Sequence, residues 1–269
     1  MLNLKEKKVF ELKTSSSVAP PNSVSYLIPV YNPGPDLIAT LQSIEQGEYL
    51  REIVVVDDQS SQGTQYLTQA QHFSKVRVIS NTNDKGISGA LNAGLTHIKD
   101  GFVARLDSGD IDLPNRIPKQ LHTLINSSCQ LVASSMLIKG QSHQGEHLQR
   151  SRYSKIFNVI SPWAIVPHPT WLFRRESVKF PYRRENLRSE DYCFLAENKL
   201  NIIVLDEPAV IYDGSGNLKF THELIATVKK VKYFILCSTN QIGAALIGAC
   251  YGLLRVGRVL LWRRKSLKR

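Results

Sequence analysis

Short apolar runs alternate along this chain with stretches whose apolar residues recur at helical spacing. The first two runs are β-branched and have no polar face, as is typical of strands covered on both sides of a parallel sheet. Strands are expected at residues 24–30, 53–56, 76–80, 102–106 and 131–138, and helices at 37–44, 64–73, 89–98 and 114–125. The alternation predicts an α/β fold, a Rossmann-like, mostly parallel sheet with helices on both faces.

Beyond residue 140 the alternation is less regular. The pattern predicts a polar loop, a helix at 154–160, a strand at 170–174, a helix at 189–198 and a strand at 202–212. We expect this half to complete the same domain. The predicted organisation is a flexible lead-in (1–23), one domain (24–225) with halves 24–139 and 140–225, and a separate tail (226–269).

Polar residues follow three of the predicted strands. Tyr31-Asn32 follows the first strand, Asp57-Asp58 the second, and Asp107-Ser108-Gly109-Asp110 the fourth. Sheets of this class bind ligands beyond the carboxyl ends of their strands. We therefore expect these residues to meet at one ligand-binding edge.

The turn at 107–110 places two carboxylates three positions apart after a buried strand. Mg²⁺ and Mn²⁺ prefer oxygen ligands, and Mg²⁺ in particular is usually held by one or two carboxylates together with substrate phosphates. The pattern predicts a metal site at Asp107 and Asp110 that requires a diphosphate partner. The alternative is an ordinary turn, since Asp, Ser and Gly are common turn residues.

Tyr31 and Asp58 suit a pyrimidine base. A carboxylate can accept the N–H of uracil or thymine, and an aromatic ring can stack on the base. Lys85, in the turn after the third strand, adds a cation that could reach phosphate or base. The alternative for Asp58 is a helix cap.

Glu190 and Asp191 open a predicted helix in the second half. Acidic residues are favoured at helix N-termini by the macrodipole, which is the plain interpretation. A carboxylate can also act as a general base, and Asp191 is the best remaining candidate for that role. His168, beside Pro169, is a weaker candidate, because such a histidine is more often a structural loop residue.

The formal charge of +11 is concentrated at the end of the chain. Residues 226–269 carry ten Lys and Arg and no acidic residue. A nucleic-acid binder would spread its basic residues over the sheet, so this class is disfavoured. A basic patch confined to an apolar segment indicates contact with anionic lipid headgroups.

Residues 233–254 are apolar for about the length of a membrane span, but the polar run 238–241 interrupts them. We expect an interfacial helix or helical hairpin rather than a span; the alternative is a helix packed on the core. The four cysteines have no ligand spacing, and the lead-in has no apolar core of signal-peptide length. These features predict a cytoplasmic protein at the inner face of the plasma membrane.

Taken together, the motifs resemble those of the inverting family 2 glycosyltransferases of GT-A fold, especially bacterial enzymes of surface-polysaccharide synthesis. The resemblance covers about 24–213. It rests on the blocks Ile28-Pro29-Val30-Tyr31-Asn32, Val55-Val56-Asp57-Asp58-Gln59-Ser60, Ala104-Arg105-Leu106-Asp107-Ser108-Gly109-Asp110, Leu113-Pro114-Asn115-Arg116 and Ser189-Glu190-Asp191-Tyr192.

The resemblance implies a residue assignment. Asp191 would be the catalytic base, and Asp107 and Asp110 would hold Mg²⁺ or Mn²⁺. Glu190 and His168 would lie on the acceptor side, in the half 140–225. The nucleotide would be contacted, in the half 24–139, by Pro29, Tyr31, Asn32, Asp58, Lys85 and Arg105.

The activity implied is transfer of a sugar from a UDP- or dTDP-sugar to a hydroxyl of a glycan or lipid-linked acceptor, with inversion. Many relatives have Asp where this chain has Gly109, which leaves open which carboxylate touches the metal. Two other classes compete: a non-catalytic nucleotide- or glycan-binding protein of the same fold, and a nucleotidyltransferase. The latter usually needs a glycine-rich loop near the first strand, where only Gly34 is found.

Overall fold

The computed structural model describes residues 22–44, 46–82, 84–139, 146–184, 189–213 and 220–266, with the side chains of 220–224 and 256–266 excepted. The strands are β1 (Val24–Val30), β2 (Leu50–Asp57), β3 (Val76–Ser80), β4 (Phe102–Arg105), β5 (Ile111–Asp112), β6 (Leu131–Lys139), β7 (Glu146–Gln149), β8 (Lys155–Ile156), β9 (Val159–Ile160), β10 (Leu172–Arg174) and β11 (Ile202–Tyr212). The helices are α1 (Asp36–Ser43), α2 (Thr64–Ala70), α3 (Ile87–His97), α4 (Arg116–Ile125), α5 (Glu190–Asn198), α6 (Phe220–Cys237) and α7 (Gln241–Ser266). The predicted lead-in lies almost wholly outside the described residues.

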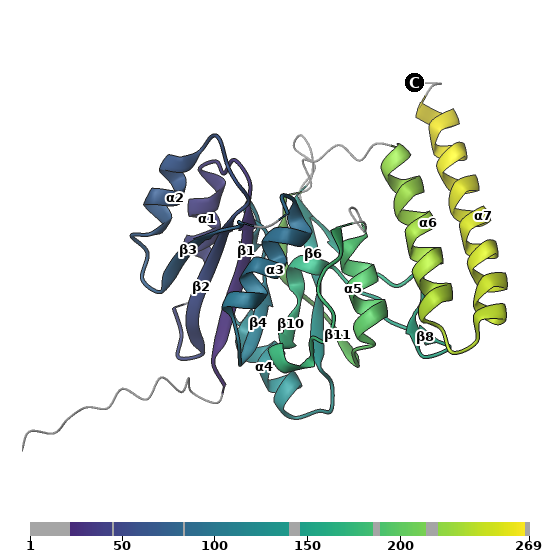
Figure 1. Cartoon of the computed structure of the whole chain (residues 1–269), viewed down its shortest axis with the longest axis horizontal. Coiled ribbons are helices and arrows are strands. Elements are labelled where there is room, and N and C mark those ends of the chain that lie inside the picture. Colours follow the sequence, from purple (N-terminus) through teal and green to yellow (C-terminus); the bar gives the residue numbers. More distant parts are fainter. Residues whose placement is uncertain are drawn as a thin grey trace, which may run out of the picture.

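One sheet organises the chain, with strand order β3-β2-β1-β4-β10-β6-β11-β5 (Figure 1). The neighbours β3, β2, β1 and β4 are parallel, as are β6 and β11, so the predicted α/β class is confirmed. Pro29 lies in the central strand β1, where a missing N–H would normally be costly. It is tolerated because β4 pairs with β1 only as far as Leu27.

The second half of the chain extends this sheet. Strand β10 inserts antiparallel between β4 and β6, and β5 pairs antiparallel with β11. The helix predicted at 154–160 is wrong: the segment forms the hairpin β8–β9. A hairpin is favoured there because Phe157 and Asn158 both take positive φ and turn the chain back. Of the predicted polar loop, residues 141–145 lie outside the described residues, and 146–149 form β7.

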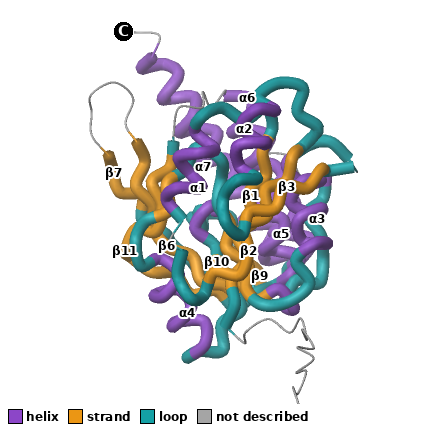
Figure 2. Tube along the Cα trace, turned by 90° about the vertical axis from the view of Figure 1, so that its left-hand side faces the viewer, coloured by secondary structure: helices purple, strands orange, loops and turns teal. Residues whose placement is uncertain are grey.

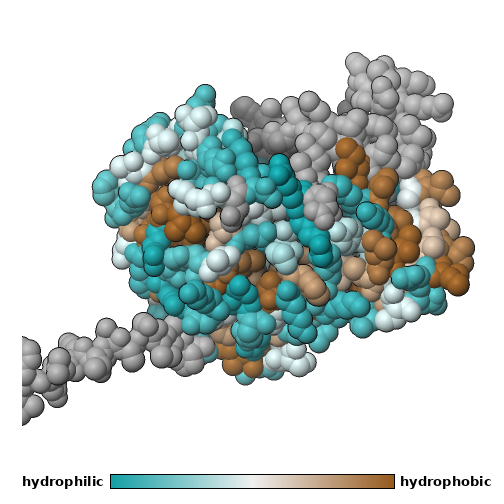
Figure 3. Space-filling view, in the orientation of Figure 1, coloured by the Kyte–Doolittle hydropathy of each residue, from teal (hydrophilic) through white to brown (hydrophobic). Residues whose placement is uncertain are grey.

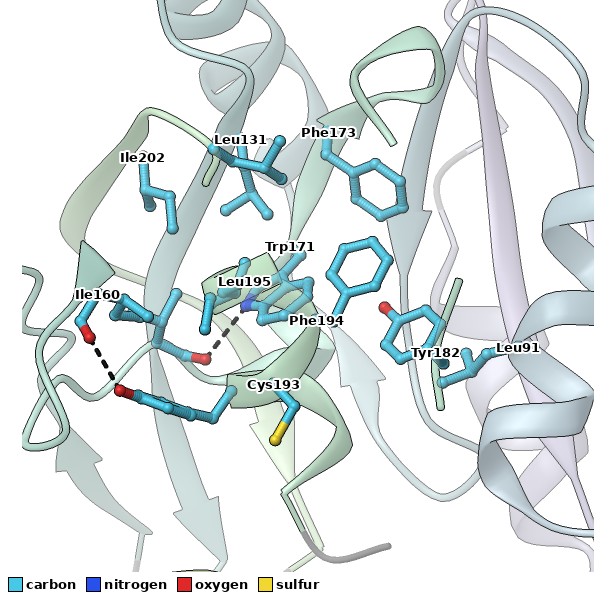
Figure 4. Packing of buried hydrophobic residues seen from close by; sticks show 14 of the residues in the cluster. Leu91, Leu131, Ile160, Trp171, Phe173, Tyr182, Cys193, Phe194, Leu195 and Ile202 are labelled. Carbon is cyan, nitrogen blue, oxygen red and sulfur yellow. Dashed lines mark hydrogen bonds between the residues drawn. The ribbon is translucent and has the colours of Figure 1, made fainter. Parts of the chain in front are cut away.

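Two apolar cores lie on opposite faces of the sheet. Helices α1, α2 and α4 contribute to one core, and α3 and α5 to the other (Figure 2). The second core is rich in aromatic rings: Tyr182 stacks on Phe194 with centroids 4.2 Å apart, and Trp171 lies beside them (Figure 4). The indole N–H of Trp171 donates to the Val166 carbonyl at 3.1 Å. These contacts fasten α5 and its loops to the sheet.

Helices α6 and α7 form an antiparallel pair outside α5 (Figure 1). Phe234 and Ala244 are fully buried and belong to the same core as α5. Other apolar side chains of the pair are exposed and give this side of the molecule a hydrophobic surface (Figure 3). These exposed residues, the hairpin face, are Ile225, Val228, Leu236, Ile242, Leu246, Leu253 and Leu254.

Among the described residues, no helix combines the length and the apolar character that a membrane span requires. The pair α6–α7 is a helical hairpin, one of the two forms that were expected, and Phe234 and Ala244 pack it on the core, as the alternative had it. Its contact with a membrane stays a prediction. Helix α6 begins at Phe220, before the predicted start of the tail. The division into domains stays a prediction.

Candidate active site at the carboxyl edge of the sheet

The turn at 107–110 follows β4 at the carboxyl edge of the sheet. Gly109 takes φ 101°, a conformation that residues with a side chain rarely adopt. Its N–H donates to the hydroxyl of Thr40 in α1 at 2.9 Å. The Asp110 N–H donates to the Asp107 carbonyl at 3.2 Å and closes the turn. The two carboxylates are therefore held on a turn that is anchored to α1.

Asp110 is the buried carboxylate of this turn, with 2% exposure. Its Oδ1 accepts a hydrogen bond from the N–H of Asp213 at 3.1 Å, whereas its Oδ2 has no partner in the part of the chain that the structure describes. Burial, and next the negative charge of Asp107, raise the pKa of Asp110 to about 8. A buried carboxyl oxygen that has no hydrogen-bond partner is stabilised by a proton or a cation. The surroundings of Asp110 therefore fit a divalent ion.

Asp107 is more open than Asp110, with its side chain 34% exposed. It forms an ion pair with Arg105, whose guanidinium is buried and also donates to the Leu106 carbonyl. Arg105 therefore lies beneath the turn and orients Asp107. Its predicted contact with a nucleotide stays a prediction.

A buried polar cluster supports the turn from below. Arg116 pairs with Asp112 at 2.6 Å and donates to the carbonyls of Arg105 and Trp171 at 2.9 and 3.2 Å. The Tyr26 hydroxyl donates to the other oxygen of Asp112 at 2.7 Å. This cluster fixes the ends of β4 and β10 relative to each other.

Tyr31 and Lys85 lie beside each other at the ends of β1 and β3. Tyr31 is 53% exposed, and Nζ of Lys85 lies 4.3 Å from the centre of its ring. The arrangement is a cation–π contact at an exposed site. Both side chains remain accessible to a planar ring or a phosphate.

Asp58 is buried and already accepts three hydrogen bonds. The Asn81 amide donates at 2.7 Å, and the Gly86 N–H lies 2.8 and 3.0 Å from the two carboxyl oxygens. Asp58 therefore holds the segment that carries Lys85 against β2. Its predicted contact with a base would share these oxygens and stays a prediction.

Asn32 and Pro29 shape the same edge from β1. The carboxamide oxygen of Asn32 accepts the N–H groups of Ser61 and Gln62 at 2.9 and 3.1 Å, which fixes the loop after β2. Pro29 is buried within the strand. Both residues shape the carboxyl edge of the sheet. Their predicted contacts with a nucleotide stay predictions.

Asp191 lies in the first turn of α5, where its carboxylate accepts its neighbour's N–H at 2.7 Å. Asp191 lines a cavity of about 710 Å³ between α5, residues 160–167 and the helix pair α6–α7. Glu190 precedes it in the same turn of helix.

His168 contacts Tyr182 through a hydrogen bond of 3.0 Å. Burial, together with the charge of Arg105, lowers the pKa of His168 well below its usual value. His168 is therefore neutral near pH 7 and packs against Trp171 and Tyr182, and its predicted place on the acceptor side stays a prediction.

Tyr182 links α5 to the segment of His168, because its ring stacks on Phe194 of α5 and its hydroxyl is hydrogen-bonded to the His168 ring at 3.0 Å. Burial raises the pKa of Tyr182; the charge of Arg105 opposes this rise, and the charges of Asp191, Glu190 and Asp107 add to it.

Three residues of this region were missed by the sequence analysis. They are Tyr182, Tyr212 and Asp213. Tyr212 ends β11 and Asp213 follows it, and the N–H of Asp213 donates to Oδ1 of Asp110 at 3.1 Å, which places both residues beside the carboxylate turn. Because Tyr212 and Asp213 lie at the end of a predicted strand, the sequence could have indicated them as site residues. Tyr182 lies in an irregular loop, and no pattern in the sequence indicates it.

Within the described residues, no cluster of three or more His, Cys, Asp or Glu could hold a metal ion unaided. The predicted binding of an ion by Asp107 and Asp110 jointly with ligand phosphates stays a prediction.

Comparison with known proteins decides the family. The profile of glycosyl transferase family 2 matches residues 25–180, which is more than half of the chain. The chain belongs to this family. The resemblance seen in the motifs is confirmed, and the family and its relatives support glycosyltransferase activity.

Curated relatives of this family 2 glycosyltransferase include enzymes of bacterial surface polysaccharides. UDP-Glc:alpha-D-GlcNAc-diphosphoundecaprenol beta-1,3-glucosyltransferase WfaP of Escherichia coli is 33% identical over 86% of this chain and 94% of its own. WfgD of Escherichia coli, of the same described activity, is 28% identical over 49% of this chain and 54% of its own. The putative glycosyltransferase EpsE of Bacillus subtilis is 31% identical over 43% of each. The chain thus spans about half the length of several relatives that it matches.

Solved structures share the fold. TarS of S. aureus (residues 1–349) has a TM-score of 0.63 at 19% identity, covering 87% of this chain and 71% of that one. Mannosyltransferase PcManGT of Pyrobaculum calidifontis, solved with GDP-Man and Mn²⁺, has a TM-score of 0.60 at 15% identity, covering 92% and 82%. The expected GT-A architecture is therefore confirmed.

Proposed function

We propose that this protein transfers a sugar from a UDP- or dTDP-sugar to a hydroxyl of a glycan or lipid-linked acceptor, with inversion, in surface-polysaccharide synthesis. The observation that carries the proposal is the turn at the carboxyl edge of the sheet that holds Asp107 beside the buried Asp110, whose Oδ2 has no partner among the described residues. The UDP-glucose in the names of WfaP and WfgD, and the complex of TarS with UDP-GlcNAc, support the donor class.

The donor would lie along the edge formed by β1, β2 and β4. Tyr31 would stack on the base, and Lys85 would compensate phosphate charge. Asp107 and Asp110 would hold Mg²⁺ or Mn²⁺, and such an ion, when bound, offsets negative charge on the leaving diphosphate. The buried Oδ2 of Asp110 supports this assignment.

Asp191 would act from the acceptor side. Its carboxylate takes the proton of the acceptor hydroxyl while the hydroxyl oxygen bonds to the anomeric carbon of the donor sugar. The bond from that carbon to the diphosphate breaks in the same step, and the nucleoside diphosphate leaves with the electron pair. A single displacement from the opposite face inverts the anomeric configuration.

The hairpin face would contact the cytoplasmic leaflet of the plasma membrane. It is apolar, and Lys229, Lys230 and Lys232 of α6 lie in the same hairpin. Apolar burial together with attraction to anionic lipid is the usual basis of interfacial binding.

A donor panel tests the proposed function. The full chain is titrated with UDP-, dTDP- and GDP-sugars with Mn²⁺ or Mg²⁺ and with a chelator, and release of the nucleoside diphosphate is measured. We expect metal-dependent binding and slow hydrolysis of one uracil or thymine donor. Absence of binding to every donor would refute the proposal.

A further inference from the structure

The cavity beside Asp191 is lined by residues that are not among the proposed contacts of the donor. It lies between α5, the segment at 160–167 and the helix pair α6–α7, and its volume is about 710 Å³. Asp191, the candidate base, is part of its wall. A ligand that fills this cavity can therefore present a hydroxyl to the base.

The charge of the cavity wall is positive. Arg152, Lys230 and Arg255 line it from three separate segments, and Asp191 is the only acidic residue among the described lining residues. The Lys230 ammonium lies 5.6 Å from the centre of the Tyr192 ring. A neutral glycan needs no such set of cations, whereas a diphosphate does.

The outer end of the same cavity is apolar and aromatic. Trp163 and Tyr251 lie with ring centroids 6.2 Å apart, and Leu254 beside them is 72% exposed. Leu254 also belongs to the hairpin face, so the apolar lining continues onto the surface of α7. A hydrocarbon chain leaving the cavity would lie along this surface.

We infer that this cavity binds the diphosphate and first hydrocarbon units of a lipid-linked acceptor, with Lys230 and Arg255 as the anchors of the diphosphate. The inference rests on the proposed function, because it assigns the acceptor of that same site. The three cations hold the diphosphate, Trp163 and Leu254 contact the chain, and the sugar points toward Asp191.

Binding of dodecyl diphosphate to the full chain, without donor, tests the site. Lys230→Gln and Arg255→Gln should each weaken binding about tenfold, the effect expected from loss of one charge-assisted hydrogen bond. Lys230→Arg should retain most of the affinity because it keeps the charge. The matched control is Lys232→Gln, since Lys232 lies exposed on the same helix and outside the cavity lining.

Two further measurements separate the alternatives. Metal-dependent donor binding should be equal in all these variants; its absence in the wild-type chain would refute the proposed function and not the acceptor site. Phosphatidylglycerol vesicles should bind Lys230→Gln, Arg255→Gln and Lys232→Gln to the same extent, because each variant loses one positive charge of the hairpin. The inference is overturned if Lys230→Gln and Arg255→Gln bind dodecyl diphosphate as Lys232→Gln does, or if, relative to Lys232→Gln, they lose phosphatidylglycerol binding as much as they lose dodecyl diphosphate binding.

Discussion

At the residue scale, the turn at 107–110 combines an open and a buried carboxylate. Asp107 is neutralised by Arg105, whereas Asp110 is buried with one oxygen that no described group satisfies. The protein therefore bears an energetic cost at Asp110 when that group ionises without a counter-ion. Ionisation of Asp110 should therefore lower the free energy of unfolding, which thermal denaturation can measure.

Asp110→Asn should stabilise the chelator-treated protein at pH 8 and have little effect at pH 5. The folded pKa of Asp110, about 8, is above that of an unfolded aspartate, so stability is full at low pH and is lost as pH rises through the folded pKa. Thermal midpoints of both proteins between pH 5 and 9 measure the effect. Parallel curves would contradict it.

Mn²⁺ or Mg²⁺ with UDP should raise the thermal midpoint of the wild-type chain at pH 8. The ion would replace the proton on Asp110, and ligands that bind only the folded state stabilise it by mass action. Asp110→Asn should respond much less. An equal rise in both proteins would place the ion elsewhere.

Asp191→Asn should abolish sugar transfer and leave metal-dependent UDP binding within about twofold. The amide keeps the shape of the carboxylate but cannot take the acceptor proton, and general-base catalysis is commonly worth about a hundredfold or more. Transfer assays and UDP titration are compared on the same preparation. Asp206→Asn, which changes an exposed carboxylate of β11, is the control. Wild-type transfer by Asp191→Asn would remove Asp191 from the mechanism.

At the element scale, α1 and α4 hold the catalytic edge in place. Thr40 of α1 binds the backbone of Gly109, and Arg116 of α4 binds the carbonyls at the ends of β4 and β10. The strand ends alone would leave the turn unsupported. These helices are therefore part of the site's framework.

Arg116→Ala should lower the free energy of unfolding by about 3–5 kcal/mol, because it leaves Asp112 charged and buried. Lys119→Ala in the same helix removes an exposed ion pair with Glu207 and should cost less than about 1 kcal/mol. Urea unfolding of the two variants makes the comparison. Similar losses would show that the buried pair has no special role.

The sequence predicted the sheet's first half well because its strands and helices are local and strongly patterned. Asp107, Asp110 and Asp191 could be proposed as site residues for the same reason, since each follows a strand or opens a helix, and their roles stay predictions. The segment 154–160 was assigned wrongly because seven residues show too little periodicity to distinguish a hairpin from a helix. Tyr182 was missed because only tertiary packing on Phe194 brings it to the site.

At the scale of the whole molecule, α6 and α7 form an apolar side (Figure 3), and the cavity that Asp191 lines lies between this helix pair and α5. Under the proposed function, an acceptor embedded in a lipid surface would reach Asp191 only if the hairpin face lies on that surface. The orientation of the molecule on the membrane would then contribute to its specificity.

Leu246→Glu combined with Leu253→Glu should reduce binding to anionic vesicles about tenfold or more, because two exposed apolar side chains of the hairpin face are lost. Leu148→Glu, an exposed leucine in β7, is the control. Vesicle co-sedimentation at fixed salt gives the fraction bound. Unchanged sedimentation of the double variant would exclude this face as the contact.

The burial of Phe234 and Ala244 in the core shared with α5 has a consequence for engineering. Removal of the helix pair α6–α7 would expose part of that core. Chimeras that exchange this pair between related enzymes would have to exchange the matching surface of α5 as well. Under the proposed function, acceptor preference and anchoring would then be inherited together, as one unit of evolutionary change.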